Sequence, residues 1–334
     1  MGSTFGPNAP LLRYPESDAP LIMANNTEQS LARELGTISG LKLKLHEPLA
    51  RYTSIKIGGP ADYLIEPQND AALADALRSL DRHAVSFCLL GNGSNVLVSD
   101  RGVRGAVIRL GGEFKRIRWQ EDDRGAWAEV GAGYSVTQLV REAARRDYAG
   151  LEFAEGIPGT IGGALYMNAG AYGSEFEKVV DRVEGMTSTG APIRLHRREM
   201  NFSYRDSHLP KGTVITRVRL RLQRAEPGAV GARLRELVGR RKSSQPSGYP
   251  NSGSMFRNPP GDYAGRLIEA AGLKGKRVGR AEISERHANF IVNLGGAQAA
   301  EVLQLIQLAQ AEVRRQFGVE LILEVKLVGE WKPA

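Results

Sequence analysis

The sequence contains one cysteine, Cys88, and five histidines. A single cysteine excludes an intramolecular disulfide and any cysteine-rich zinc site. The histidines form no H-E-x-x-H pair, so the sequence offers no argument for a metal site. Cys88 lies in the apolar run VSFCLLG, and this setting predicts a small buried side chain.

Long hydrophobic runs and a leader pattern are also missing. The apolar runs are far shorter than the roughly 20 residues that a membrane-spanning helix needs. The first residues show no charged region followed by a continuous apolar stretch, so they do not resemble a secretory signal peptide. We therefore expect no membrane insertion and a location in the reducing cytoplasm.

Clustered basic charge is absent as well, although the net charge is +8, from 45 basic and 37 acidic residues. A positive balance favours anionic partners, either nucleic acid or small phosphorylated ligands. No run of five or more like charges occurs, and a dedicated nucleic-acid binder usually clusters its lysines and arginines. We therefore do not expect nucleic acid as a partner.

The chain of 334 residues, 42% apolar and 25% charged, is long enough for two or three domains with sizeable cores. Residues 1–40 carry several prolines and little periodicity. They predict a mobile extension with a short helix at SLARELG, and regular structure from near Leu41. The composition shifts at QRAEPGAVG, near residue 225, and this shift predicts a linker.

Beyond residue 41, short apolar strands alternate with amphipathic helices. Strands are predicted at residues 61–67, 85–91, 105–112, 114–120, 126–133, 214–222, 287–296 and 319–329. Helices are predicted at residues 71–80, 135–147, 232–242, 263–272 and 297–318. The helix at 135–147 has an apolar stripe formed by Val136, Leu139, Val140 and Ala143. No internal repeat is present, so the expected fold class is α+β, with mixed sheets and at least two domains.

The strand at residues 214–222 alternates apolar residues with Arg217, Arg219 and Arg221. This pattern is typical of a half-exposed antiparallel strand, and its arginines more often form a solvated face than a ligand site.

Three glycine-rich stretches occur at Ser54–Asp62, Leu89–Asp100 and Gly156–Gly173. Neither G-x-G-x-x-G nor G-x-x-x-x-G-K-[ST] is present, so Rossmann and P-loop sites are not supported. A turn such as the one around Gly93 can still point backbone N–H groups at a phosphate. Each stretch alone is typical of a tight turn. Together they leave a large flat ligand about as favoured as three ordinary turns.

Ser254 follows a glycine in PNSGSMFRNPP, a composition typical of turns. No G-x-S-x-G elbow holds it, so a nucleophilic role is not supported. The residues alone therefore favour an ordinary turn.

Seven motifs nevertheless occur in the order and spacing of one family. They are SIKIGGPADYLIEP, LLGNGSNVLVSD, EFAEGIPGTIGGALYMNAGAYG, FSYRDS, YPNSGSMFRNP, ISERHANFIVN and LEVKLVGEW. From about Leu41 to Trp331 the chain resembles the UDP-N-acetylenolpyruvoylglucosamine reductases, and within them the second type, whose substrate domain lacks an extra loop of the first.

The resemblance implies a fold with an FAD-binding module of the vanillyl-alcohol-oxidase (PCMH) type and a C-terminal substrate-binding domain of α+β structure. FAD-binding subdomains are then expected at residues 41–112 and 113–228, and the substrate-binding domain at residues 229–318. The terminal strand, residues 319–331, is expected to pack back on the second subdomain.

The resemblance also implies the reaction, which belongs to peptidoglycan precursor synthesis and so to cell-wall growth, cell shape and division. NADPH reduces the non-covalently bound FAD, and the flavin N5 passes hydride to C3 of the enolpyruvyl ether in UDP-N-acetylglucosamine enolpyruvate. A proton then reaches C2, and the product is UDP-N-acetylmuramate. The family's proton donor corresponds to Ser254, and a neutral hydroxyl suffices if it lies within hydrogen-bond reach, because C2 becomes strongly basic as hydride arrives.

Further site residues follow from the same motifs. The catalytic set is completed by Arg205 and Glu324. The expected cofactor-binding residues are Ile57, Gly58, Gly59, Gly91, Asn92, Gly93, Ser94, Asn95, Gly156, Pro158, Gly159, Thr160, Gly162, Gly163, Asn168 and Gly170. The expected substrate-binding residues are Tyr172, Tyr249, Arg257 and Asn258, and Lys242 is a further candidate for the diphosphate.

Simpler interpretations of these side chains stay open. Arg205 can bind the substrate carboxylate bidentately, or it can form a surface ion pair with Asp206. Glu324 shares a strand face with Lys326, so a solvated pair is the alternative to a catalytic role. A catalytic Glu324 near a carboxylate must be neutral, share a proton or be compensated by a cation.

The closing motif departs from the family's usual Pro-Glu-Val-Arg, because Leu323 and Lys326 replace the proline and the arginine. Lysine keeps the charge but loses the guanidinium fork, which puts any bidentate contact at this position in doubt. For the two tyrosines, core packing is as favoured as substrate contact. His287 is expected to pack or cap at the start of its strand.

Two other functions remain as alternatives. One is an oxidase of the same flavin fold that acts on a small hydroxylated molecule, which would require an active-site base or a covalent flavin link. The other is a basic nucleic-acid binder, whose affinity would fall steeply with salt.

Overall fold

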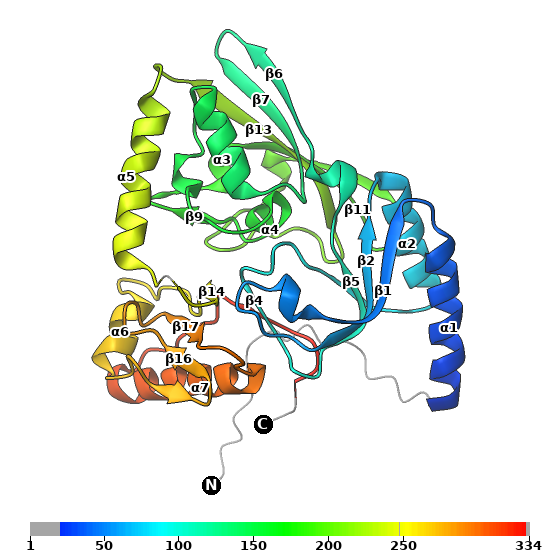
Figure 1. The fold of residues 1–334 in the computed structure, drawn as a ribbon. Coiled ribbons are helices and arrows are strands. Elements are labelled where there is room, and N and C mark those ends of the chain that lie inside the picture. The colour runs from blue at the N-terminus through cyan, green and yellow to red at the C-terminus, as the bar shows by residue number, and fades with distance from the viewer. Residues whose placement is uncertain (1–20, 247, 332–334) are drawn as a thin grey trace.

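A computed structural model describes residues 21–246 and 248–331 (Figure 1). Its first sheet has the order β1-β2-β5-β3, in which β1 and β2 are antiparallel and β5 is parallel to β2 and β3. The strands are β1 (Leu41–Pro48), β2 (Pro60–Pro67), β3 (Phe87–Leu89) and β5 (Val103–Ile108). Helix α2 (Asp70–Arg82) packs on this sheet, and its N-cap Asn69 accepts a hydrogen bond of 2.9 Å from the Ala72 N–H.

The N-terminal helix corrects the expectation for residues 1–40. Residues 1–20 lie outside the described residues, but α1 (Leu21–Thr37) begins long before residue 41. Its Leu31 and Leu35 are fully buried in the core beneath α2. The helix therefore belongs to the folded structure at least from Leu31 onward. The sequence did not reveal this because its apolar stripe consists of two leucines among mostly polar residues.

The second sheet has the order β12-β11-β13-β7-β6, and β8 (Tyr148–Ala149) also pairs with β13. Its strands are β6 (Ile117–Asp122), β7 (Gly125–Gly131), β11 (Val180–Met186), β12 (Pro192–His196) and β13 (Val214–Arg224). Helix α3 (Val136–Arg145) packs here and buries all four residues of its predicted stripe. Helix α4 (Ile161–Tyr166) packs beside it on the same core.

The arginines of β13 form the solvated face that the alternation predicted. Arg217 pairs with Asp70 at 2.5 Å and Arg221 pairs with Asp122 at 2.6 Å. The Arg219 guanidinium lies over the Trp127 ring, 4.1 Å from its centroid.

The C-terminal part follows α5 (Ala229–Ser244), which runs along one side of the molecule (Figure 1). Its sheet has the order β14-β17-β16-β15, and α6 (Ala264–Ala270) and α7 (Ala299–Phe317) share its core. The strands are β14 (Asn251–Ser254), β15 (Arg277–Val278), β16 (Ala281–Ile283) and β17 (Phe290–Asn293). Gly318 ends α7 in the left-handed conformation, with φ 68°, at the end of the helix predicted over residues 297–318.

The last described segment crosses back over the molecule. Only β18 (Lys326–Val328) of the predicted strand at 319–329 is regular, and it pairs in parallel with β4 (Val96–Val98). The regular strand therefore pairs with residues 41–112 and not with residues 113–228 as expected, although Glu324 just before it contacts the latter through Arg205. Just before β18 the chain lies against the residues that follow β14, through a bridge between Phe256 and Leu323.

Three smaller points concern expectations from the sequence. Cys88 is partly exposed and not buried, because its strand β3 borders a large cavity. Within residues 21–246 and 248–331, no helix is long and apolar enough to cross a membrane. The same residues hold no group of three or more potential metal ligands among His, Cys, Asp and Glu.

Candidate active site

A cavity of about 600 Å³ lies where the three parts of the molecule meet. One wall is the turn Gly91–Asn95 between β3 and β4, and a second wall is the chain around α4. Arg205, Ser254 and Glu324 also line this cavity, although each comes from a different part of the sequence. The fold therefore brings together the residues that the sequence assigned to cofactor and to catalysis.

The turn Gly91–Asn95 depends on a glycine that no other residue can replace without a shift. Gly93 has φ 62°, and a Cβ atom there would lie 2.3 Å from the Tyr52 carbonyl oxygen. The Gly93 carbonyl accepts a hydrogen bond of 3.0 Å from the Ser54 N–H. This contact explains why SIKIGGPAD and LLGNGSNVLVSD occur in one chain, since the first stretch supports the second.

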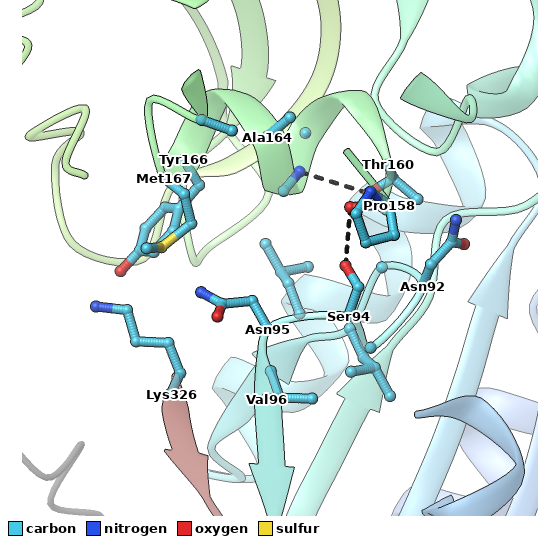
Figure 2. A pocket seen from close by; sticks show the side chains of 18 of the residues that line it. Asn92, Ser94, Asn95, Val96, Pro158, Thr160, Ala164, Tyr166, Met167 and Lys326 are labelled. Atoms are coloured by element: carbon cyan, nitrogen blue, oxygen red, sulfur yellow. Dashed lines mark hydrogen bonds between the residues drawn. The ribbon is translucent and has the colours of Figure 1, made fainter. Parts of the chain in front are cut away.

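The wall around α4 approaches the turn closely (Figure 2). The Ser94 hydroxyl donates a hydrogen bond of 3.0 Å to the Pro158 carbonyl. Thr160 caps α4 by accepting from the Gly163 N–H at 3.4 Å. Gly159 has φ 135°, and a Cβ on Gly162 would lie 3.0 Å from the Ala132 Cβ, so at these two positions the wall is bare backbone.

Eleven of the expected cofactor residues line the cavity. They are Gly91, Asn92, Gly93, Ser94, Asn95, Pro158, Gly159, Thr160, Gly162, Gly163 and Gly170. The other five, Ile57, Gly58, Gly59, Gly156 and Asn168, lie behind the lining. Asn168 is fully buried, and its amide donates to the Ser203 carbonyl at 3.2 Å and accepts from the Glu177 N–H at 3.0 Å. It ties the α4 wall to the loop that carries Arg205.

Arg205 and Glu324 form an ion pair at one end of the cavity. The Arg205 Nε donates to the Glu324 Oε1 at 2.9 Å, and the two side chains are 19% and 17% exposed. Arg205 has φ 60°, in the left-handed region that non-glycine residues rarely adopt. Arg205 therefore pairs with Glu324, and not with Asp206, which the sequence had left open as an alternative partner.

The electrostatics of Glu324 follow from its position. Burial raises the pKa of its carboxyl above the ordinary 4.5, although Arg205, Arg257 and Lys326 act in the opposite direction. Lys326 also lines the cavity, and burial together with the nearby Arg257 lowers the pKa of its ammonium below 10.5. The alternative of a solvated pair between Glu324 and Lys326 therefore does not apply, because the Glu324 side chain is mostly buried.

Ser254 closes β14 on the cavity wall. Gly253 before it has φ 74°, and its N–H donates to the Asn251 side chain at 3.1 Å. Phe256 is 2% exposed, so it anchors the turn by burial. The hydroxyl of Ser254 is thus held on a rigid strand end that faces the same space as Glu324.

The expected substrate residues do not line the cavity. Tyr249 is 54% exposed, while the Tyr172 hydroxyl donates to the Leu237 carbonyl at 3.5 Å. Asn258 accepts from the Ala264 N–H at 3.1 Å at the start of α6. Arg257 acts on Glu324 and Lys326 through its charge, and its buried Nε has no hydrogen-bond partner among the residues that the structure describes. The side chain of Lys242 lies outside the described residues.

Several residues that line the cavity were not among those expected from the sequence, and two of them are Tyr166 and Arg241. Tyr166 ends α4, and in Figure 2 its side chain lies opposite Lys326. Arg241 reaches the cavity from α5, donates to the Glu155 carbonyl at 3.4 Å and has its pKa lowered by burial. Tyr166 could have been found as the one polar side chain in the run GGALYM, whereas GRRK gives no sign of which arginine turns inward.

His287 behaves as predicted. Its Nδ1 accepts from the Asn289 N–H at 3.2 Å, its ring packs edge-on against Phe290 with centroids 4.9 Å apart, and burial lowers its pKa.

Comparison with known proteins identifies the two main parts of the chain. A model of the FAD binding domain matches residues 61–196. A second model, the C-terminal domain of UDP-N-acetylenolpyruvoylglucosamine reductase, matches residues 245–328. Both agree with the predicted fold, an α+β chain with an FAD-binding module followed by a separate C-terminal domain.

Full-length relatives carry the same name. The chain is 48% identical to UDP-N-acetylenolpyruvoylglucosamine reductase 2 of Symbiobacterium thermophilum, over 87% of this chain and 94% of the relative. It is 42% identical to the reductase of Bacillus velezensis, over 92% and 99%. The crystal structure of the reductase from Thermus caldophilus superposes with a TM-score of 0.73 at 41% identity, covering 86% of this chain and 98% of that one. The chain therefore belongs to the UDP-N-acetylenolpyruvoylglucosamine reductase family.

Proposed function

We propose that the protein is an FAD-dependent oxidoreductase that uses NADPH to reduce the enolpyruvyl double bond of UDP-N-acetylglucosamine enolpyruvate, giving UDP-N-acetylmuramate for peptidoglycan. The observation that carries this proposal is the convergence of Arg205, Ser254 and Glu324 on the cavity whose other walls are the glycine turns. The cytoplasmic location expected from the sequence remains a prediction.

The cavity fits FAD by size and by the chemistry of its walls. Its volume of about 600 Å³ lies within the range of cofactor pockets. Gly93, Gly159 and Gly162 leave the backbone bare, and a Cβ added at Gly91 would lie 2.5 Å from the Thr160 hydroxyl. Arg109, Lys115 and Arg241 add positive charge to the lining, which suits a diphosphate.

We assign the cofactor to the turn Gly91–Asn95 and to the α4 wall. Backbone N–H groups of a tight glycine turn suit phosphate oxygens, and bare backbone suits a flat ring system. Bound there, FAD supplies the hydride that reduces the substrate. The reacting carbon then has to lie at the end of the cavity that Ser254, Arg205 and Glu324 share.

Arg205 is assigned to the substrate carboxylate. Negative charge grows on that carboxylate as the double bond is reduced, and a guanidinium fork can bind both of its oxygens. In the structure Arg205 binds Glu324 through its Nε. The planar guanidinium carries further N–H donors, so it can hold Glu324 and the substrate at once.

Ser254 is assigned the proton that reaches C2, as a general acid. Glu324 is assigned to the same anionic end, and its raised pKa supports a carboxyl that is neutral or shares a proton when substrate binds. A second carboxylate held there in ionised form would repel the substrate. Lys326, on the same wall, offsets the remaining negative charge.

A visible absorption spectrum tests the proposal most directly. The purified protein should show flavin bands, which bleach when NADPH is added anaerobically and return when the enolpyruvyl sugar nucleotide is added. A colourless protein that takes up no added FAD would remove the proposal. Flavin that bleaches with NADPH but is not re-oxidised by the sugar nucleotide would contradict the proposed substrate, and flavin that is bleached by a small hydroxylated molecule and not by NADPH would favour the oxidase alternative.

A further inference from the structure

The segment that carries Glu324 lies between the two halves of the proposed site, and the following inference rests on the proposed function. On one side the Glu324 N–H donates to the Met255 carbonyl at 2.9 Å, directly after Ser254. On the other side β18 pairs in parallel with β4, beginning at Lys326 and Val96. The segment is therefore clamped between the serine strand and the cofactor turn.

Asn95 holds this segment on the side of the cofactor turn. Its side-chain Nδ2 donates to the Glu324 carbonyl at 3.1 Å, and its backbone carbonyl accepts from the Lys326 N–H at 3.0 Å. The two bonds enclose Val325, which is only 2% exposed. The side-chain amide thus extends the β4–β18 ladder by one carbonyl, to the residue that carries the catalytic carboxyl.

This contact fixes which side chains enter the cavity. In an extended chain successive side chains point to opposite sides, so Glu324 and Lys326 line the cavity while Val325 is buried in the core. A shift of one residue would place Val325 in the cavity and bury the carboxyl of Glu324. Two bonds from one residue to both neighbours of Val325 oppose that shift.

The serine strand does not depend on Asn95. The Ser54 hydroxyl donates to the Asn251 carbonyl at 2.8 Å, and the Ser252 hydroxyl donates to the Val96 carbonyl at 2.9 Å. These contacts hold β14 on the cofactor turn without involving Glu324. Removal of the Asn95 amide should therefore disturb Glu324 and Lys326 and leave Ser254 in place.

We propose that Asn95 is a positioning residue for Glu324, in addition to its predicted place on the cofactor turn. It sets the register of the terminal segment against that turn, so the carboxyl reaches the substrate end of the cavity. Its role belongs to the half-reaction that consumes the sugar nucleotide, because Glu324 is assigned to that substrate's anionic end.

Two Asn95 variants and a matched control test the proposal. Asn95→Ala removes the hydrogen-bond donor. Asn95→Asp keeps the side-chain volume but replaces the donor with an acceptor. If one of the two variants fails to fold, the other still tests the proposal. Gln310→Ala is the control, because the Gln310 Nε2 donates to the Leu321 carbonyl at 2.9 Å, on the same segment but outside the cavity lining. All proteins are compared as FAD-loaded enzymes, with the FAD dissociation constant and the melting temperature measured for each.

Anaerobic stopped-flow absorbance then separates the two half-reactions. For Asn95→Ala we expect re-oxidation of the NADPH-reduced enzyme by the enolpyruvyl sugar nucleotide to slow at least about tenfold, because small misplacements of catalytic groups have effects of this size or larger. Asn95 also lies on the proposed cofactor turn, so FAD affinity and reduction by NADPH are expected to fall as well. Both half-reactions are therefore measured with the enzyme saturated with FAD, and re-oxidation should slow at least about tenfold more than reduction does. The control should leave both half-reactions within about threefold of wild type.

The double variant Asn95→Ala, Glu324→Gln distinguishes positioning from a separate contribution. If Asn95 acts through the Glu324 carboxyl, then Asn95→Ala should slow re-oxidation by less than about threefold in an enzyme that already carries Glu324→Gln. A further tenfold loss, or an equal slowing of both half-reactions, would overturn the proposal. So would a defect confined to FAD affinity.

Hydrogen exchange of the substrate-free enzyme gives a readout that does not require the proposed reaction. The amide protons of Val325 and Lys326 should exchange at least about tenfold faster in Asn95→Ala than in wild type and in the Gln310→Ala control. Unchanged exchange would overturn the clamp. Failure of the wild-type enzyme to be re-oxidised would overturn the proposed function instead.

Discussion

The walls that we propose for the cofactor (the cofactor walls) and the end of the cavity that we propose for catalysis (the catalytic end) are built in different ways. The cofactor walls, Gly91–Asn95 and Ile157–Gly163, are two continuous stretches whose shape comes from the backbone. The catalytic end takes one side chain each from three loops or strand ends, and Arg205 and Glu324 meet across 119 residues of sequence. FAD binding at the glycine turns should therefore be most sensitive to substitutions that add atoms. Catalysis should be most sensitive to substitutions that remove or displace a functional group.

The largest effect that sharpens this contrast is expected for Ser254→Ala. Loss of a general acid typically slows a reaction by about 10²–10⁴, and this loss should appear only in the re-oxidation of reduced enzyme by the sugar nucleotide. Anaerobic stopped-flow absorbance measures both half-reactions. Equal losses in reduction and re-oxidation would remove Ser254 from the catalytic end. The neighbouring Ser252→Ala, which loses a hydrogen bond to the Val96 carbonyl, should lower stability by about 1 kcal/mol and spare re-oxidation.

Arg205→Lys is expected to have the next largest effect. Lysine keeps the charge but cannot hold Glu324 and a carboxylate at once in planar geometry, so kcat for the sugar nucleotide should fall by about 10²–10³. Steady-state kinetics measure the change. Normal kcat with only a raised KM would mean that the charge binds the substrate and has no special role as it reacts.

Gly93→Ala should break the other side of the comparison. The new Cβ would lie 2.3 Å from the Tyr52 carbonyl oxygen, so the turn must move, and we expect a stability loss of about 3 kcal/mol with weaker FAD binding. Thermal unfolding and FAD fluorescence titration measure these changes. Gly318→Ala is the matched control, because φ is similar, at 68°, and no atom lies within 4 Å of the added Cβ. It should cost only about 1 kcal/mol and leave FAD affinity unchanged.

The smallest effect concerns pH and Glu324. Because its pKa is raised by burial, the folded protein binds a proton that the unfolded chain releases. The stabilising contribution is then fully present below the unfolded pKa and is lost as pH rises through the folded one. The free energy of unfolding of the wild-type protein should therefore fall as pH rises above 4.5, on the order of 1.4 kcal/mol per unit by which the pKa is raised. Glu324→Gln should remove this pH dependence, and unfolding free energies measured across that pH range test it.

The same variant has a consequence for turnover. Re-oxidation by the sugar nucleotide should slow about tenfold, because an amide cannot share a proton as the carboxyl does. Full turnover by Glu324→Gln would contradict a protonated or proton-sharing role for this group.

The two regions also differ in how far the sequence predicted them. Gly93 was identified from the chain as a turn glycine because its conformation, with φ 62°, is a local requirement that glycine meets best. Its close approach to the Tyr52 carbonyl oxygen comes from a distant segment and was not predicted. The stripe of α3 and the end of α7 at Gly318 are also local, because they follow from periodicity and capping. These features depend on residues a few positions apart.

The catalytic end was beyond local reasoning. On residues alone, Ser254 was favoured as a turn residue and Glu324 as half of a solvated pair, because their burial depends on segments far away in the sequence. The resemblance placed both in the catalytic set, but it gave no warning that Tyr172 would bond to α5 or that Asn258 would cap α6. Arg241 and Tyr166 were missed because tertiary packing decides which side chains of a helix point into the cavity.

The pairing of the terminal segment with the cofactor turn has a consequence for the order of assembly. Asn95 and Glu324 are 229 residues apart, so a ribosome adding about 5–20 residues per second needs on the order of 10–45 s between them. During that interval β4 lacks its β18 partner, and the nascent chain presents an open strand edge beside the cofactor turn. The residues of the proposed cofactor turn are therefore synthesised well before Glu324 and the strand that pairs beside them.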